Sequence, residues 1–452
     1  MMQGKASEMA ATQTIPTGYK QTEVGIIPED WRVSTVGNEY EIKLGKMLDS
    51  VKNRGVPKLF LGNRAVQWGY IDISDLSTVP MSRSDIEMFR LCDGDLLVCE
   101  GGEVGRAAIW NSPISECYYQ KALHRLRPLH SFNSQLMASL LRYWADSGFL
   151  RNYVTQTSIA HLPREKFMEV PMPIPPVYEQ TAIASTLCDT DALLTGLEQL
   201  IAKKQAIKTA AMQQLLTGRT RLPQFALRPD GTPKGYKSSE LGQIPEDWEV
   251  LAIDDCATKV GSGKTPNGGA SVYIDAGRPF VRSQNIGWGK LILDDVAYIS
   301  DDIHNTFSGS EIKEDDVLLN ITGASIGRCA ITEGYIIGGN VNQHVCIIRL
   351  NSVLLNARLL VGLINSRNGQ KQIDSYQAGG NREGLNFQQV RQLKFAVSNS
   401  SVEQTAIATI LSDMDNELTA LEQKLAKARD VKQGMMQQLL TGRIRLPLPQ
   451  EA

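Results

Sequence analysis

Two short strings in this sequence resemble motifs that act on nucleotides or nucleic acids, and each lacks a part that its chemistry requires. The string GSGKT at Gly261–Thr265 ends like a phosphate-binding loop, but that loop needs a further glycine at the place of Thr258. The stretch from Pro28 to Lys43 superficially resembles a metal-dependent nuclease core. Its second copy has Thr258 and Lys259 where a glutamate–x–lysine string should fall. Neither a nucleotide site nor a nuclease site is predicted.

A third string, PPVY at Pro175–Tyr178, resembles the Pro-Pro-aromatic loop of adenine methyltransferases. No Asn or Asp precedes it, and no glycine-rich cofactor loop follows a clear strand. The string GGEVGR at Gly101–Arg106 predicts a tight turn between strands, with Arg106 and its counterpart Arg328 exposed or paired. The sequence shows no Ser/His/Asp or Cys/His set and no Cys/His cluster at zinc spacing. This pattern predicts a binding protein and not a catalyst.

Length and composition bound the class of protein. A chain of 452 residues suggests two or three domains. The formal net charge of −2 does not exclude nucleic acid, because a basic face can be balanced elsewhere. Seven cysteines without a C-x-x-C pair favour free thiols in a reducing compartment. The start lacks the apolar core of a signal peptide, and no stretch approaches the ~18 apolar residues of a membrane span. We therefore expect a soluble cytoplasmic protein.

Two internal repeats give the chain its organisation. Residues 179–223 and 403–447 are identical at 28 of 45 positions, and both end in MQQLLTGR followed by a variable residue and RLP. A second pair, GYKQTEVGIIPEDW at 18–31 and GYKSSELGQIPEDW at 235–248, matches at ten of fourteen positions. The order is cap, body, helix, then cap, body, helix, which predicts two halves related by a pseudo-two-fold rotation.

The longer repeat predicts two long helices that end at Gly218 and Gly442, since glycine is the usual C-terminal cap. Apolar residues recur every seven positions in both copies, which predicts an antiparallel two-helix coiled coil. Lys208 and Lys432 interrupt the seam at the same place, and each either fixes the register or extends into solvent. The predicted seam residues are Ile183, Leu187, Leu194, Leu197, Ile201, Leu215, Ile407, Leu411, Leu418, Leu421, Leu425 and Leu439.

The bodies between these frames, about 32–170 and 249–395, diverge much more than the frames do. Short apolar runs such as LLVC and VLLN, separated by glycine-rich turns, predict strands. We expect each body to be mixed α/β with a small sheet. A shared frame that carries two unlike bodies suits a linear target with two different marks, for which DNA is the obvious candidate.

The repeated strings identify a family resemblance. GYKQTEVGIIPEDW, PMPIPPVYEQTAIASTL, MQQLLTGRTRLP and their second copies resemble the specificity subunit of type I restriction–modification enzymes. GKMLDSVKN, VQWGYID and CEGGEVGRAAIW are similar to one class of target recognition domain, and GSGKTP with RSQNIGWGKL to another. One departure is FAVSNSSVEQ before the second helix, in place of the proline-rich MPIPPVYEQ.

The resemblance implies two target recognition domains separated by the coiled coil. Each domain would read one half of an asymmetric, bipartite site in double-stranded DNA, and the helices would set the spacer. The chain would have no catalytic activity and no cofactor. Two methyltransferase subunits, which bind S-adenosylmethionine and methylate adenine N6, would dock on it. Two motor–nuclease subunits that use ATP and Mg²⁺ would complete the endonuclease. The alternatives are a coiled-coil adaptor that binds only proteins, and an enzyme with a fused restriction function.

The predicted boundaries follow the repeats: a tail at 1–17, recognition domains at 18–176 and 235–400, helices at 177–220 and 401–443, a linker at 221–234 and a tail at 444–452. Arg and Lys side chains suit guanine, and Asn and Gln suit adenine. We expect Trp68 and Trp288 to pack under the loops, and His161 and His304 to lie at the surface. The predicted DNA-binding residues are Lys46, Lys52, Arg54, Asn63, Arg64, Gln67, Tyr118, Tyr119, Gln120, Lys121, Lys264, Arg282, Ser283, Gln284, Asn285, Asn342, Gln343, His344 and Arg382.

Overall fold

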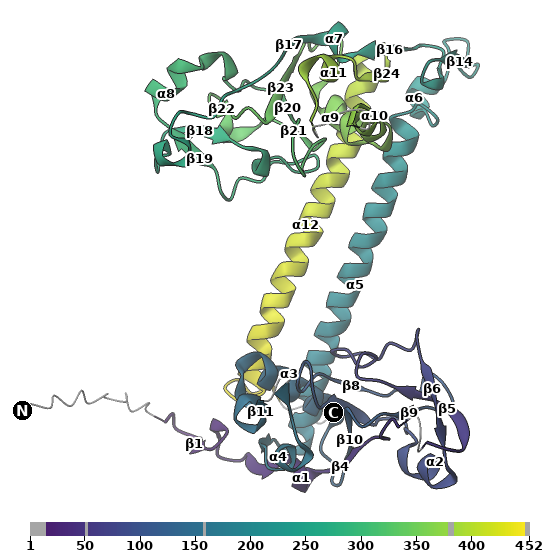
Figure 1. Cartoon of the computed structure of the whole chain (residues 1–452), viewed down its shortest axis with the longest axis vertical. Helices are drawn as coiled ribbons and strands as arrows, with labels where there is room; N and C mark the ends of the chain where they lie inside the picture. Colours follow the sequence, from purple (N-terminus) through teal and green to yellow (C-terminus); the bar gives the residue numbers. More distant parts are fainter. Residues whose placement is uncertain (1–14, 50–52, 157–159, 378–383, 448–452) are drawn as a thin grey trace, which may run out of the picture. The chain divides into compact units, whose positions relative to one another are not determined.

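A computed structural model describes residues 15–49, 53–156, 160–377 and 384–447. The chain divides into two compact units, residues 1–198 with 424–452 and residues 199–423. Each unit contains a mixed α/β body and a segment of both long helices, α5 (Val177–Leu215) and α12 (Ser401–Leu439) (Figure 1). Among the described residues, no helix combines the length and the apolar character that crossing a membrane requires.

The body of the first unit is built on two sheets. The larger is antiparallel in the order β4-β10-β7-β8, and in the smaller β5 pairs antiparallel with β6 and parallel with β9. The strands are β4 (Tyr40–Leu44), β5 (Val56–Leu61), β6 (Ser77–Met81), β7 (Leu96–Cys99), β8 (Ala107–Ile109), β9 (Tyr118–Tyr119) and β10 (Leu123–Pro128).

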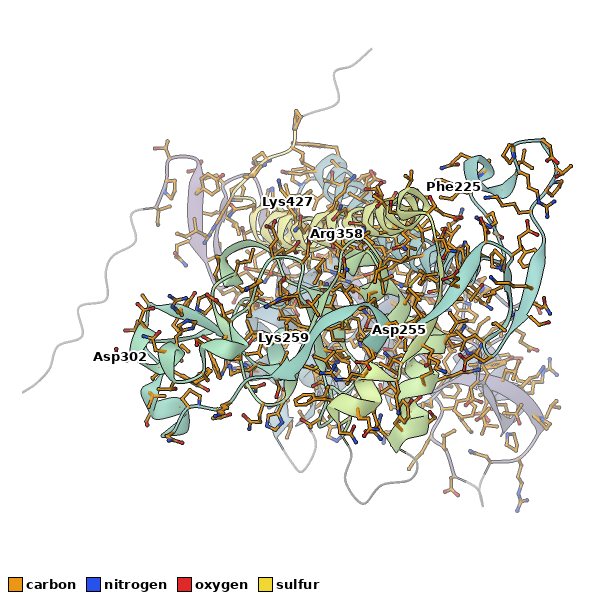
Figure 2. All side chains as sticks on the ribbon, turned by 90° about the horizontal axis from the view of Figure 1, so that it is seen from above. Phe225, Asp255, Lys259, Asp302, Arg358 and Lys427 are labelled. Atoms are coloured by element: carbon orange, nitrogen blue, oxygen red, sulfur yellow. The ribbon has the colours of Figure 1, made fainter. Side chains whose placement is uncertain are left out.

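The body of the second unit repeats this plan. Its larger sheet is antiparallel in the order β17-β23-β20-β21, and in the smaller β18 pairs antiparallel with β19 and parallel with β22. The side chain of Lys259 on β17, which Figure 2 labels, donates a hydrogen bond to the carbonyl of Gly309. The strands are β17 (Ala257–Ser262), β18 (Arg278–Val281), β19 (Ala297–Ile299), β20 (Val317–Asn320), β21 (Cys329–Ile331), β22 (Asn340–Val341) and β23 (Val345–Leu350).

Smaller elements frame both bodies. The remaining strand pairs are β1 (Tyr19–Thr22) with β2 (Gly25–Pro28), β3 (Arg32–Thr35) with β13 (Pro171–Ile174), β11 (Thr155–Gln156) with β12 (Ala160–His161), β14 (Tyr236–Ser239) with β15 (Gly242–Pro245), and β16 (Trp248–Ala252) with β24 (Lys394–Ser398). The short helices are α1 (Val36–Glu39), α2 (Arg83–Phe89), α3 (Ser134–Ser147), α4 (Arg164–Met168), α6 (Pro223–Ala226), α7 (Ile253–Cys256), α8 (Asp301–Thr306), α9 (Ala357–Asn365), α10 (Arg367–Gln377) and α11 (Phe387–Arg391), with 3₁₀ turns η1 (Phe149–Tyr153), η2 (Gly269–Val272), η3 (Ser283–Asn285), η4 (Ser308–Ser310) and η5 (Gly334–Ile336).

Within each unit the two long helices pack antiparallel. In the first unit, Asp191 and Glu198 of α5 form ion pairs with Lys432 and Arg429 of α12, respectively. In the second unit the pairs are Lys208–Asp415 and Lys204–Glu417. The residue numbers rise on one helix as they fall on the other. The two lysines that interrupt the seam therefore bind a carboxylate of the facing helix in both copies, at positions related by the repeat.

The predicted seam residues lie on the buried side of these helices. Ile183 and Leu187 share the core of the first unit with Leu439, and Leu215 shares that of the second with Ile407 and Leu411. Ile183, Leu187, Leu197, Leu215, Ile407, Leu411, Leu418, Leu425 and Leu439 are buried, and Leu194, Ile201 and Leu421 are half-buried.

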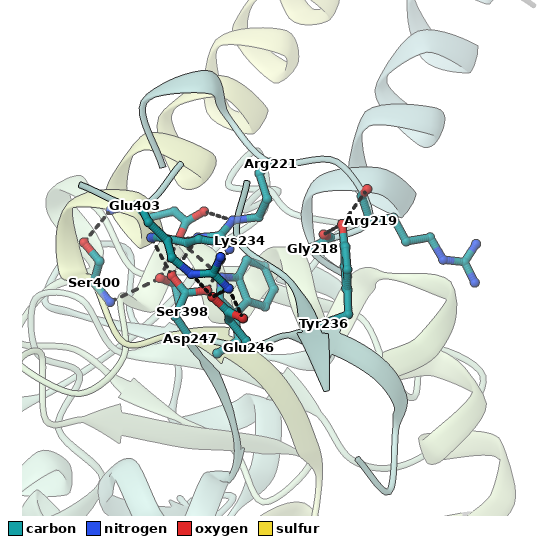
Figure 3. Close-up of polar contacts among 12 residues, drawn as sticks. Gly218, Arg219, Arg221, Lys234, Tyr236, Glu246, Asp247, Ser398, Ser400 and Glu403 are labelled. Carbon is teal, nitrogen blue, oxygen red and sulfur yellow. Dashed lines mark hydrogen bonds and ion pairs between the residues drawn. The ribbon is translucent and has the colours of Figure 1, made fainter. Parts of the chain in front are cut away.

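In the second unit, an arginine at the end of the repeated string joins the start of α12 to the cap (Figure 3). Arg221 forms bidentate pairs with Glu403 on α12, at 2.7 and 2.8 Å, and with Asp247, at 2.7 and 3.1 Å. Trp248 Nε1 also donates to Glu403 at 3.2 Å, and Ser398 Oγ donates to it at 2.5 Å. The guanidinium lies over the Trp248 ring. These contacts explain why Glu, Asp-Trp and Arg occur together in the repeated strings.

The same arrangement closes the first unit, although its parts come from opposite ends of the chain. Arg445 pairs with Glu179 on α5 at 2.6 and 2.8 Å and with Asp30 at 2.9 and 2.8 Å. Trp31 Nε1 donates to Glu179 at 2.9 Å. We call these two arrangements the arginine clasps: Arg445, Glu179, Asp30 and Trp31 in the first unit, and Arg221, Glu403, Asp247 and Trp248 in the second.

The glycine that ends each long helix is needed for two reasons. Gly218 and Gly442 adopt φ of +66° and +67°, a left-handed conformation that favours glycine. A Cβ at Gly218 would lie 2.4 Å from Pro245 Cγ, and one at Gly442 would lie 2.5 Å from Pro28 Cδ. The predicted cap glycines are confirmed, and they let each helix end against the cap of the same unit.

Candidate nucleic-acid interface

In each unit, one glycine allows a loop to pass directly over the small sheet. A Cβ at Gly45 would lie 2.3 Å from the carbonyl oxygen of Tyr119, and one at Gly263 would lie 1.7 Å from that of Val341. Gly45 of GKM and Gly263, the second glycine of GSGKT, are therefore packing residues, because no side chain fits at this approach. Each is followed by a lysine, so Lys46 and Lys264 occupy equivalent places in the two units.

In the first unit, hydrogen bonds hold three loops together at the edge of the small sheet. Asn63 Nδ2 donates to the carbonyl of Gly101 at 3.0 Å, and an Arg106 Nη donates to the carbonyl of Asn63 at 2.9 Å. Gly101 in turn bridges His161 of β12. Gln67 Nε2 donates to the carbonyl of Arg64 at 2.7 Å. Asn63 and Gln67 thus shape the loop with their amides and are half-buried.

Of the predicted cations, Arg64 and Lys121 follow β5 and β9 at this edge, whereas Arg54 precedes β5. Arg54, Arg64 and Lys121 are exposed, and no side-chain partner is found for them among the described residues. Lys46 is half-buried and pairs with Asp85 at 2.8 Å, and Gln120 forms a bridge with it. Three of the predicted cations are therefore free to meet a phosphate or a base, and Lys46 is engaged elsewhere.

Tyr118 and Tyr119 are not surface residues. Both are fully buried on β9, with Tyr119 in the core beneath the loops and Tyr118 against Val79 and Met81. Tyr118 Oη donates to Glu116 at 2.5 Å. Successive residues of a strand face opposite sides, and here both sides of β9 are covered. We therefore exclude both tyrosines from the interface. Lys52 lies outside the described residues.

In the second unit, Asp295 binds two of the side chains that were predicted to read bases. Arg282 pairs with Asp295 at 3.1 Å and lies over the Tyr273 ring, and Gln284 Nε2 donates to Asp295 at 2.7 Å. Asn285 is buried and donates to the carbonyls of Ile292 and Asp295 at 2.9 and 2.8 Å. Asn285 is a structural residue of its loop and is removed from the interface.

Among the other predicted residues of the second unit, Asn342, Gln343 and His344 follow β22, and Lys264 follows Gly263, whose N–H donates to the carbonyl of Asn342. Lys264 and Gln343 are exposed, and Ser283 and His344 are half-buried. Asn342 is buried, and its Oδ1 accepts from the backbone N–H of His344 at 3.0 Å, so it too is structural. Arg382 lies outside the described residues.

Sequence reasoning missed two hydroxyls in this group. Thr265 Oγ1 donates to Gln343 Oε1, and Thr322 Oγ1 lies 2.6 Å from His344 Nδ1. Isolated threonines in glycine-rich strings carry no sequence signal of this kind, because the contacts join residues 22 and 78 positions apart.

Four expectations about tryptophan and histidine side chains can be compared with the structure. Trp68 is half-buried and donates to Glu103 at 2.5 Å, but Trp288 is 51% exposed, so the expectation that it packs under its loop is wrong. His161 is exposed as expected. His304 is buried, since its Nδ1 bonds Asn340 Oδ1 at 2.7 Å beneath α8, and its predicted surface position is wrong.

Burial governs the ionisable groups near the first-unit loops. It raises the pKa of Glu100, although the neighbouring His161 and Lys121 oppose this effect. It also lowers the pKa of His124 to about 4, so that ring is neutral at pH 7. Among the described residues, no cluster of His, Cys, Asp and Glu could hold a metal ion. The arrangement offers cations, amides and hydroxyls on ordered loops, which is the chemistry of groove recognition.

The comparisons with known proteins agree with this geometry. The family model described as the type I restriction modification DNA specificity domain matches residues 28–209 and again residues 245–428. The MjaVIII specificity subunit, a type I restriction enzyme component of Methanocaldococcus jannaschii, is 23% identical over 434 residues, covering 93% of this chain and 94% of that protein. The EcoBI specificity subunit of Escherichia coli is 26% identical over 225 residues, covering 46% of this chain and 44% of that protein.

Solved structures share the fold. The crystal structure of the type I restriction–modification S subunit from M. genitalium has a TM-score of 0.57 at 14% identity, covering 91% of this chain and 96% of that one. A chain from a structural study of complex assembly in the type I R-M system has a TM-score of 0.52 at 13% identity, covering 92% and 99%. With both repeats matched by the family model, this chain belongs to the type I restriction–modification DNA specificity family.

Proposed function

We propose that this chain is the subunit that gives a type I restriction–modification complex its DNA sequence specificity. The loop face of each unit contacts one half of an asymmetric, bipartite site in double-stranded DNA, and the long helices set the spacer between the halves. The chain itself makes and breaks no covalent bond.

The observation that carries this proposal is the contrast between the two units. Both build the same pair of sheets and the same close glycine approach, yet their exposed loop residues differ. The first unit presents Arg54, Arg64 and Lys121, whereas the second presents Lys264 and Gln343. A common scaffold with unlike polar surfaces fits the reading of two unlike half-sites.

The remaining activities belong to partner subunits in this proposal. Two methyltransferase subunits with S-adenosylmethionine dock on the chain and methylate adenine N6 in each half-site. The target base must leave the stack, so the reader has to hold the duplex beside the methyltransferase pocket. Two motor–nuclease subunits with ATP and Mg²⁺ cleave DNA that is unmethylated.

Selection of duplexes from a randomised library by the assembled methyltransferase complex tests the proposal. We expect enrichment of a motif split into two halves by a fixed spacer. Arg64→Ala should weaken binding to the selected site by about 1–3 kcal/mol if Arg64 makes a bidentate base contact. Arg32→Ala is the matched control, because Arg32 is an exposed arginine on β3, away from the loops. Absence of any enriched motif would favour a protein-only adaptor.

A second experiment addresses catalysis. The purified chain alone, incubated with duplex DNA, Mg²⁺ and S-adenosylmethionine, should neither cleave nor methylate. Methyl incorporation or cleavage that co-purifies with this chain through two chromatography steps would show an enzyme and overturn that part of the proposal.

A further inference from the structure

Gln343 of the second unit is an exposed amide whose two ends are both held by neighbours. Its Oε1 accepts a hydrogen bond from Thr265 Oγ1. Its Nε2 lies 3.0 Å from His344 Nε2. An amide nitrogen has no lone pair, so Gln343 Nε2 must be the donor and His344 Nε2 the acceptor.

The His344 imidazole also hydrogen-bonds a fourth side chain, that of Thr322. A neutral imidazole that accepts at Nε2 carries its proton on Nδ1, so His344 Nδ1 donates to Thr322 Oγ1 at 2.6 Å. The backbone N–H of His344 is also fixed, by Asn342 Oδ1 at 3.0 Å. Thr265, Gln343, His344 and Thr322 therefore form one chain of hydrogen bonds across three loops, which holds the Gln343 amide in a fixed position.

After these bonds, the Gln343 amide keeps one N–H and one oxygen lone pair. A glutamine that offers one donor and one acceptor side by side matches the N7 acceptor and N6 donor of adenine in the major groove. We propose that Gln343 is the adenine-reading residue of the half-site bound by the second unit. This inference rests on the proposed function and names one base that the second unit recognises.

The first unit carries a different residue at the same place in its fold. Gln120 N–H donates to Leu61 as Asn342 N–H donates to Val281, and the residue after Gln120 is Lys121. Lys121 thus corresponds to Gln343, and Ala122 takes the place of His344. A lysine has only donors and no fixed orientation, which suits guanine O6 and N7 or a phosphate. The two units therefore present different hydrogen-bonding groups at this equivalent position.

The test is selection from a duplex library by the assembled complex with wild-type chain, Gln343→Ala and Gln343→Lys. Wild type should require adenine at one position of one half-site. Gln343→Ala should reduce that preference about tenfold while leaving the other half-site unchanged. Gln343→Lys, which copies the first unit, should move the preference toward guanine. Thr265→Val removes only the bond to Oε1 and should give a smaller loss at the same position.

Lys121→Ala is the matched control, and it should leave the Gln343-dependent position unchanged. Because Gln343 is exposed, circular dichroism and the thermal midpoint should match wild type in each variant. An unchanged selection profile for Gln343→Ala, or an equal loss of affinity for all sequences, would overturn base reading by Gln343. Failure of the wild-type complex to enrich any split motif would instead overturn the proposed function.

Discussion

The first-unit arginine clasp predicts that Arg445→Ala will destabilise the fold although only seven residues follow Arg445 in the sequence. The Glu179 side chain is only 2% exposed. Without Arg445, the indole N–H of Trp31 is the one side-chain donor left to its carboxylate among the described residues. Removing one partner of a buried ion pair costs about 3–5 kcal/mol. Arg445 is 35% exposed, so water can enter the vacated space, and we lower the expected cost to about 2–3 kcal/mol.

For a unit of this size, each kcal/mol lowers the thermal midpoint by about 2–4 °C, so the expected decrease is about 4–12 °C. Differential scanning calorimetry of the purified chain measures it. Adding Glu179→Gln to Arg445→Ala should recover part of the loss, because a neutral amide is less costly to bury than a lone carboxylate. Asp30→Asn is the control, since half of the Asp30 side chain is exposed and its loss should cost about 1 kcal/mol or less.

Two outcomes would refute this reasoning. An Arg445→Ala midpoint within 1 °C of wild type would mean that Glu179 finds another partner. A double variant with Glu179→Gln that loses the full sum of the two single losses would mean that the pair does not interact energetically. Arg221→Ala in the second unit gives an independent comparison, because Ser398 remains as a donor to the matching glutamate.

Three further predictions concern packing and pH. Gly263→Ala should lower the stability of the second unit by about 3 kcal/mol in urea unfolding, whereas Gly261→Ala, with open space around its Cβ, should cost about 1 kcal/mol or less. Gly196→Ala, on an exposed and unobstructed site of α5, should raise stability by about 0.5–1 kcal/mol. Burial raises the pKa of Asp247, but hydrogen bonds from Arg221 and Lys234 outweigh this effect and hold that pKa at about 2. The resulting stabilisation is complete above about pH 4, the ordinary aspartate value, and should disappear as the pH falls toward 2. Acid titration of the unfolding free energy measures this pH dependence, which Asp247→Asn should remove.

The repeated frame could be predicted from sequence because its residues recur in two copies with the same spacing. Helix ends at glycine, the seven-residue apolar period and the paired lysines all have local signals. The clasps had a weaker signal. Arg221 lies in the segment 221–234, which the repeats predict as a linker, and Arg445 lies in the segment 444–452, which they predict as a tail. Their glutamate partners lie 182 and 266 residues away, so only the folded chain brings these charges together.

The loop residues could be chosen from sequence only by chemical type. Arg64 and Tyr119 were equally plausible readers, yet Arg64 is exposed and Tyr119 is in the core. Asn285 and Asn342 show why short polar residues mislead: the same amide that can read a base can instead satisfy backbone groups of its own loop. Whether an amide faces inward depends on how its loop folds, and the residue type alone does not predict this.

The division of roles within each unit has a consequence for how specificity can change. The residues that fix the backbone, Gly45 and Gly263 under the loops and the arginine clasps at the frame, occur in both copies and tolerate little replacement. The exposed residues Lys121 and Gln343 differ between the copies and contribute little to packing. Surface substitutions of this kind usually change stability by less than about 0.5 kcal/mol. Exchange of Lys121 and Gln343 between the units should therefore leave the fold intact, so the scaffold permits new base preferences to arise by single substitutions without refolding of the unit that carries them.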